Sequence, residues 1–231
     1  MAHPITETLQ ELDNAIRQRF DPLGFFEGPN GSFATGRVPA VAPQAHLCWR
    51  YAGLDEAGIE AAENSAGRYI PEPYKALLRH MNGARFLGVS LLGEIGGSVD
   101  RSGIGIGQPV SIRYQNIIGR PDYIPNGHLG IGAINGEWFS QGHLYLTTTG
   151  EVELYNARCD LIGKRWPSLV AFFNEEMNRR FTLYEPNGSK KSGAKHIPGD
   201  TEDWEQLAEA AKAKLRGDGF IKKIMNRLTP Q

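Results

Sequence analysis

The spacing of apolar residues changes twice along this chain, and that change restricts the possible folds more than any other feature. Near the N-terminus, an apolar residue recurs every three or four residues, the spacing of one face of a helix: Ile5, Leu9, Leu12 and Ile16. Over residues 84–154 the period becomes that of strands. Helical spacing returns at Val170, Phe173, Met177 and Phe181. This order predicts an α+β fold, with a largely antiparallel or mixed central sheet flanked by helices.

Turn and capping residues predict further elements. A helix is expected from residue 54 or 55 to residue 65, with Gly67 just past its end. Another is expected over residues 72–81, where Asn82-Gly83 ends it with a left-handed cap or a turn. Residues 22–43 are rich in Gly and Pro and predict an irregular connection with one short strand near residues 36–41. The other expected elements are strands at 46–51, 86–92, 129–132 and 138–140, a hairpin of 144–147 with 152–155, a short helix at 111–118 and a helix at 168–181.

Composition excludes several classes of protein. The 231 residues include 25 Lys and Arg against 26 Asp and Glu, so the formal net charge is −1. A balanced charge provides no global field for nucleic acid or an anionic membrane. No apolar run is long enough to span a bilayer, and the N-terminus lacks the apolar core of a signal peptide, so we expect a cytoplasmic location. Cys48 and Cys159 are too few and too far apart for a disulfide framework or a zinc site, and we expect free thiols.

Motifs for catalysis or cofactor binding are weak. The six histidines show no HExxH spacing, and there is no GxSxG element for a serine nucleophile. Gly103, Gly105 and Gly107 lack the lysine and the following helix of a phosphate-binding loop, because Gln108-Pro109 comes next. The carboxylate pairs Glu151/Glu153 and Glu175/Glu176 show no sign of the desolvation that acid–base catalysis needs. We therefore predict no catalytic residue, no metal site and no cofactor.

The order of motifs over residues 54–181 resembles the SUKH superfamily, the bacterial immunity proteins related to fungal cell-wall-assembly regulators. The matching pieces, in chain order, are Ile59-Glu60-Ala61-Ala62-Glu63, Ile70-Pro71 followed by Tyr74-Lys75 and Leu77-Leu78, Asn82-Gly83, Leu91-Leu92-Gly93, Tyr123-Ile124-Pro125, Leu129-Gly130-Ile131-Gly132, Tyr145-Leu146, Thr149-Gly150-Glu151-Val152 and Leu169-Val170-Ala171-Phe172-Phe173. The chain departs from the family at Ala133-Ile134-Asn135-Gly136-Glu137-Trp138, where an aspartate-rich turn is usual, and in the apparent insertion at 96–107. The resemblance implies a division into an N-terminal helix and irregular extension (1–50), a SUKH-like domain (51–184), a linker (185–200) and a C-terminal helical tail (201–231).

The resemblance also implies a function without catalysis. Such proteins bind a cognate toxin domain, usually encoded beside them, and block it. Residues 51–72 carry five acidic residues and one arginine, and residues 187–231 carry nine basic residues and six acidic ones. An acidic body suits a basic toxin, because opposite charges steer the approach of two proteins. The predicted toxin-binding residues are Asp55, Glu56, Glu60, Glu63, Glu137, Glu151 and Glu153.

Two alternatives remain at this point. The first is an intracellular scaffold or regulatory module of the same fold, in which the basic amphipathic segment 220–228 docks a partner helix or a membrane surface. The second is an enzyme or a nucleic-acid binder that uses the 96–107 loop or the tail, although the favoured reading has no direct nucleic-acid contact. The sequence does not specify the toxin or the oligomeric state.

Overall fold

A computed structural model describes residues 3–28, 31–42, 45–95, 109–135, 141–157, 159–195 and 197–198, together with Gln206 and Ala210. The strands are β1 (Phe25–Glu27), β2 (Phe33–Arg37), β3 (His46–Ala52), β4 (Met81–Phe86), β5 (Val89–Gly93), β6 (Val110–Ser111), β7 (Leu129–Asn135), β8 (Gln141–Leu146), β9 (Val152–Asn156) and β10 (Ile162–Trp166). The helices are α1 (Pro4–Phe20), α2 (Glu56–Ala66), α3 (Glu72–His80), α4 (Leu169–Phe172) and α5 (Asn178–Thr182), with a 3-10 turn η1 (Asp21–Leu23) and π-helical turns η3 (Tyr114–Ile118) and η4 (Phe173–Met177).

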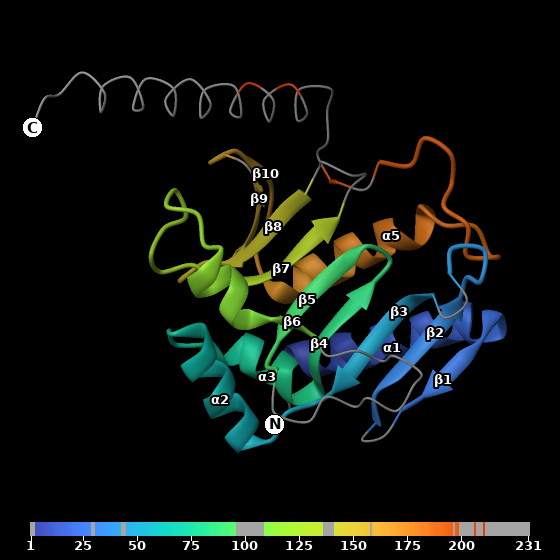
Figure 1. The fold of residues 1–231 in the computed structure, drawn as a ribbon, viewed down its shortest axis with the longest axis horizontal. Helices are drawn as coiled ribbons and strands as arrows, with labels where there is room; N and C mark the ends of the chain where they lie inside the picture. Colours follow the sequence, from blue (N-terminus) through green and yellow to red (C-terminus); the bar gives the residue numbers. More distant parts are fainter. Residues whose placement is uncertain are drawn as a thin grey trace, which may run out of the picture.

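The strands form one large sheet in the order β1-β2-β3-β4-β5-β7-β8-β9-β10 (Figure 1). Every pair along this path is antiparallel, and only the short β6 runs parallel, beside the end of β5. The expected α+β fold with a largely antiparallel sheet is therefore confirmed. Among the described residues, no helix is both long and apolar enough to cross a membrane.

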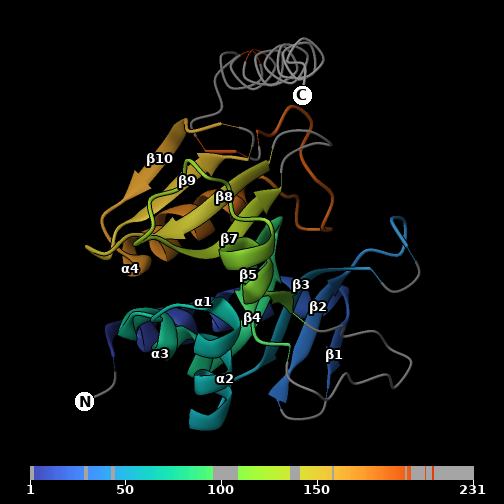
Figure 2. The ribbon, with the colours of Figure 1, turned by 60° about the vertical axis from the view of Figure 1, so that its left-hand side comes forward.

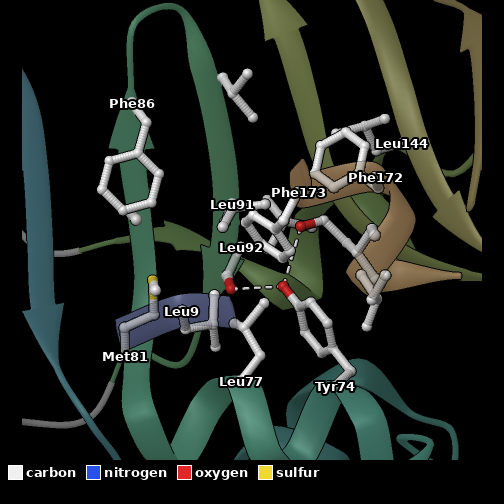
Figure 3. Close-up of a cluster of buried hydrophobic side chains, with 14 of the residues drawn as sticks. Leu9, Tyr74, Leu77, Met81, Phe86, Leu91, Leu92, Leu144, Phe172 and Phe173 are labelled. Carbon is white, nitrogen blue, oxygen red and sulfur yellow. Dashed lines mark hydrogen bonds between the residues drawn. The ribbon is translucent and has the colours of Figure 1, made fainter. Parts of the chain in front are cut away.

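The helices α1, α3 and the continuous α4–η4–α5 segment pack on one face of the sheet, which we call the inner face (Figures 1 and 2). The four apolar residues that predict α1 are all buried there. Tyr74 of α3 is fully buried among them, and its hydroxyl lies 2.8 Å from the carbonyl oxygen of Leu92 and 3.0 Å from that of Ile131 (Figure 3). One side chain thus links the helical layer to both β5 and β7.

The Asn82-Gly83 pair does not end a helix in a cap, contrary to the prediction. Both residues lie within β4, which follows α3 directly at Met81. The Asn82 amide instead bonds the backbone of Glu94 in both directions, at 2.7 and 2.8 Å, and so extends the pairing of β4 with β5. Gly83 has a φ of +76°, and a Cβ there would lie 2.8 Å from the Leu91 carbonyl oxygen. Glycine is needed where the backbones of β4 and β5 approach each other this closely.

The N-terminal segment is also more ordered than predicted. Residues 22–43 contain β1 and β2, and the short strand expected near residues 36–41 lies instead at Phe33–Arg37. The strand expected at 86–92 is two strands, β4 and β5, joined by a turn at residues 87–88, and β10 was not predicted. Each of these strands pairs with its neighbour along the chain, β1 with β2, β2 with β3, β4 with β5 and β9 with β10, and composition alone does not report such pairing.

The boundary expected between residues 50 and 51 lies inside β3. Asp13 of α1 contacts Arg50 of β3 at 3.1 Å and His80 of α3 at 2.9 Å, so the N-terminal segment is tied to elements on both sides of that boundary. The described part of the expected linker also folds back on the body. Tyr184 pairs with Lys190 in a β-bridge, and Ile197 is buried. The expected tail, apart from Gln206 and Ala210, lies outside the described residues.

Candidate functional site: a groove on the outer face of the sheet

A row of mostly polar residues crosses the face of the sheet opposite α1, α3 and α4–η4–α5, which we call the outer face. Strand register pairs Trp49 with Arg85, Arg85 with Ser90, Ser90 with Ala133, Ala133 with His143, and His143 with Tyr155. Successive residues of a strand point to opposite faces, and the neighbours Phe86, Leu91, Leu144 and Leu154 are buried in the core. The row therefore belongs to the outer face, and five strand pairings bring it together.

The turn η3 lies against this face because Gly130 leaves room for it. A Cβ at Gly130 would lie 2.9 Å from Cγ of Gln115, so only glycine accepts the Gln115 side chain at this distance. The side-chain amide of Asn116 accepts from the N–H of Gly130 and donates to its carbonyl, each at 2.8 Å. Gly130 lies in the part of β7 that does not pair with β5. Gln115 also donates to the Leu144 carbonyl at 3.1 Å. These bonds fix η3 as a wall beside the row.

The wall and the row enclose a cleft of about 370 Å³. It is lined by Arg85, Ser90, Leu92, Val110, Tyr114, Gln115, Gly119, Ala133 and His143. A second hollow of about 330 Å³ adjoins it and is lined by Ala45, His46, Leu47, Trp49, Arg85, Gly88, Val89 and Ser90. Arg85 and Ser90 line both, so the two hollows form one groove across the sheet. None of these described lining residues is acidic.

Arg85 supplies the formal charge of the groove. Its side chain is exposed, and among the residues that the structure describes no carboxylate lies within ion-pair distance of it. Burial lowers the pKa of His143, which favours the neutral imidazole at neutral pH. The Nδ1 atom of His143 has no hydrogen-bond partner within the described part of the chain. The groove therefore offers the Arg85 guanidinium, which has no internal counter-charge among the described residues, beside the imidazole of His143.

A second polar cluster, on the same face, surrounds Glu153 of β9. Its carboxylate accepts hydrogen bonds from Arg165 at 2.7 Å and Tyr155 at 2.9 Å, and it lies 3.1 Å from Nε2 of His128. Burial acts to raise the pKa of Glu153, but these bonds outweigh it and hold the pKa below its ordinary value. Burial and the neighbouring carboxylate raise the pKa of Tyr155 to about 12. Glu153 is therefore a structural anion that joins β9, β10 and the segment before β7.

The lowered pKa of Glu153 predicts a pH-dependent stability. A carboxyl with a depressed folded-state pKa stabilises the fold above its unfolded pKa, and this contribution disappears as the pH falls through the folded pKa. We expect Glu153→Gln to lower the free energy of unfolding by about 1–2 kcal/mol at neutral pH. The difference from the unmodified protein should shrink between about pH 5 and about pH 3. Urea unfolding followed by fluorescence at each pH measures both. Glu151→Gln, an exposed position on the same hairpin, is the control, and an equal loss in that variant would contradict the prediction.

The predicted toxin-binding acids do not form one surface. Asp55 caps α2 by accepting from the Gly58 N–H at 2.8 Å, and Glu56 pairs with Arg79 at 2.8 Å. Glu63 pairs with Lys75 at 2.9 Å, whereas Glu60 is exposed on α2. Glu151 and Glu153 belong to the β8–β9 hairpin region, and α2 and β9 lie well apart in both views of the ribbon (Figures 1 and 2). Glu137 lies outside the described residues.

The carboxylate pairs and the cysteines differ in how they agree with the prediction. Neither carboxylate pair was expected to have a desolvated member, yet Glu153 and Glu176 are both buried, and each is paired with an arginine, Arg165 and Arg180. Both cysteines are free, as predicted, and burial raises the pKa of the Cys48 thiol, which disfavours the reactive thiolate. Within the described ranges, no group of three or more His, Cys, Asp or Glu side chains is arranged to hold a metal ion.

The groove was not predicted from the sequence. Arg85, Ser90 and His143 come from three different strands, and only strand register brings them together. The available signal was local: His143 alternates with Leu144, and Arg85 lies between Ala84 and Phe86, as expected of residues on the outer face of a strand. The chain matches no protein-family model, no curated protein and no solved structure.

Proposed function

We propose that this protein is an immunity protein of the SUKH type, which binds a cognate toxin domain in the cytoplasm and blocks it. The proposal draws on the ordered motifs of residues 54–181 and on one structural observation. Three large apolar side chains of η3 are exposed beside the groove: Tyr114 (58%), Ile117 (46%) and Ile118 (66%). Neighbouring exposed apolar residues at the rim of a polar hollow are typical of a protein-binding surface.

The structure changes which surface we assign to the toxin. The acids of α2 are largely engaged within the protein, since Asp55 caps a helix and Glu56 and Glu63 pair with Arg79 and Lys75. A carboxylate that is already paired with a cation of the same protein attracts a basic partner only weakly. Tyr114 and Ile118 of η3 stay more than half exposed. Arg85, which lines the same cleft as Tyr114, has no carboxylate within ion-pair distance among the described residues. We therefore assign the toxin contact to η3 and the groove, with an acidic group of the toxin facing Arg85.

Co-expression tests the function directly. The product of a toxin gene adjacent to this one is expressed in cells with and without this protein, and cell survival is measured. We expect rescue, together with a one-to-one complex of the purified proteins in size-exclusion chromatography. Survival that does not change with co-expression, and no complex with the neighbouring gene product, would reject the immunity function.

Substitution of the rim tests the assigned surface. We expect Ile118→Asp to weaken the complex about 30-fold, because a charge at the centre of an apolar contact removes a hot spot of about 2 kcal/mol. Isothermal titration calorimetry measures the affinity. Asn174→Asp places the same charge on an exposed position of η4, in the helical layer, and should leave the affinity within about twofold of the unmodified protein. A loss of similar size in both variants would show that the toxin does not bind at η3.

A further inference from the structure

The cleft between η3 and strands β5, β7 and β8 has the size and the walls of a site for a small organic ligand. Its volume of about 370 Å³ falls in the range of about 300–1,000 Å³ that such sites occupy. The floor consists of paired strand residues, and the wall is held by the hydrogen bonds of Gln115 and Asn116. A site on strands and on an anchored turn is formed before the ligand arrives, so binding costs little ordering of the protein.

The polar groups of the cleft select for charge. Arg85 is the one formally charged side chain among the described lining residues, and no acid accompanies it there. A guanidinium presents N–H groups in a planar fork that matches the two oxygens of a carboxylate. His143, neutral because burial lowers its pKa, adds a polar group without a second positive charge. A single positive charge fits a ligand with a single negative charge better than a dianion such as phosphate.

The rest of the lining selects for an apolar body. Leu92, Val110 and Ala133 present aliphatic surface, and the ring of Tyr114 lies at the edge of the cleft against Gly119, where a Cβ would be 2.9 Å from the ring. The second hollow beyond Arg85 adds Leu47 and Trp49. A ligand anchored at Arg85 can therefore place hydrophobic groups on either side of its charged end.

We propose that this cleft is a binding site for a carboxylate carried on a hydrophobic body, with Arg85 as the anchor of the carboxylate. Two sources share this chemistry: a free aromatic or aliphatic acid, and the C-terminal carboxylate of a peptide chain. The site shares Arg85 and the wall of η3 with the surface proposed for the toxin. Its test uses the isolated protein, so a failure to bind a carboxylate and a failure to bind a toxin are separate results.

The test is a titration of the isotope-labelled full-length protein, followed by NMR at the His143 ring and the Arg85 side chain. The probes are benzoate, its neutral counterpart benzamide, N-acetylphenylalanine and the amide of N-acetylphenylalanine, all at constant ionic strength. We expect saturable shifts with one or both acids and a Kd on the order of 1 mM, as for other small probes. Benzamide and the amide should bind at least about tenfold more weakly, because they lack the charge that pairs with Arg85. Tighter binding of benzoate indicates a free acid as the natural ligand, and tighter binding of N-acetylphenylalanine indicates a chain terminus.

Substitutions locate the site. Arg85→Gln should weaken binding of the preferred acid at least about tenfold, and Arg85→Lys should retain part of it, because lysine keeps the charge but not the planar fork. Arg113→Gln makes the same charge change at an exposed arginine that does not line the cleft, and should leave the affinity unchanged. Circular dichroism checks that each variant is folded. The proposal is overturned by the absence of saturable shifts with both acids, by equal binding of an acid and its amide, or by an equal loss in Arg113→Gln.

Discussion

Glu176→Ala is expected to lower the free energy of unfolding by about 3–5 kcal/mol, because it removes a buried carboxylate that pairs with a buried arginine. Glu176 is 1% exposed and Arg180 is not exposed at all. One carboxylate oxygen of Glu176 accepts from Nε of Arg180 at 2.6 Å and from Nη2 of Arg179 at 2.6 Å. Arg180 also donates to the carbonyl of Leu87, at 3.0 Å, and so ties α5 to the turn between β4 and β5.

Loss of a proton from Arg180 cannot reduce this destabilisation. Burial lowers the pKa of Arg180, but the guanidinium keeps its charge at any pH at which the protein folds. Urea unfolding followed by tryptophan fluorescence measures the loss. Glu175→Ala is a matched control, since Glu175 is the preceding residue of the same helix but pairs with Lys164, at 2.7 Å, in a largely solvated contact. We expect that variant to lose less than about 1 kcal/mol. Equal losses in the two variants would mean that burial of the pair has no energetic consequence.

The same two glutamates show what the sequence could predict. Adjacent helical residues point in different directions, and Glu175 and Glu176 do so, toward Lys164 and Arg180. The helix that carries them was expected at residues 168–181, and the structure has a continuous helical segment from Leu169 to Thr182 with Ser168 as its cap. Spacing and capping are local properties, so helices of this kind can be predicted from the sequence. Arg180, the buried partner of Glu176, also donates to the carbonyl of Leu87, 93 residues away along the chain, and no local pattern contains that information.

The candidate site is non-local in the same way. The sequence suggested acidic residues because their number is visible in the composition, but their partners Arg79, Lys75 and Arg165 come from other elements. Conversely, Arg85 is one of many arginines in the sequence, and it becomes notable only when the sheet leaves it without an acidic partner among the described residues. The sequence could therefore predict the class of fold, whereas the charge available at the surface follows from the contacts made after folding.

The division of the chain is open to a direct test at Leu9. This residue of α1 is fully buried and packs near Met81 and Leu77, which lie beyond the boundary expected at residue 50 (Figure 3). Leu9→Ala should lower the free energy of unfolding by about 2–5 kcal/mol, the cost of a cavity in a packed core. Glu11→Ala, at an exposed position of the same helix, should change it by less than about 0.5 kcal/mol.

Amide hydrogen exchange then shows whether α1 and the later strands unfold as one unit. If residues 3–20 belong to the same cooperative structure as β7, β8 and β9, Leu9→Ala lowers the protection of the slowest amides in those strands by the same free energy as global unfolding. If the N-terminal segment is a separate extension, only amides of α1 and its immediate neighbours lose protection. The contacts of Asp13 with Arg50 and His80, and the continuity of β3 across residue 50, favour the first result. Unchanged protection in β7–β9, together with faster exchange in α1, would instead support the boundary expected at residue 50.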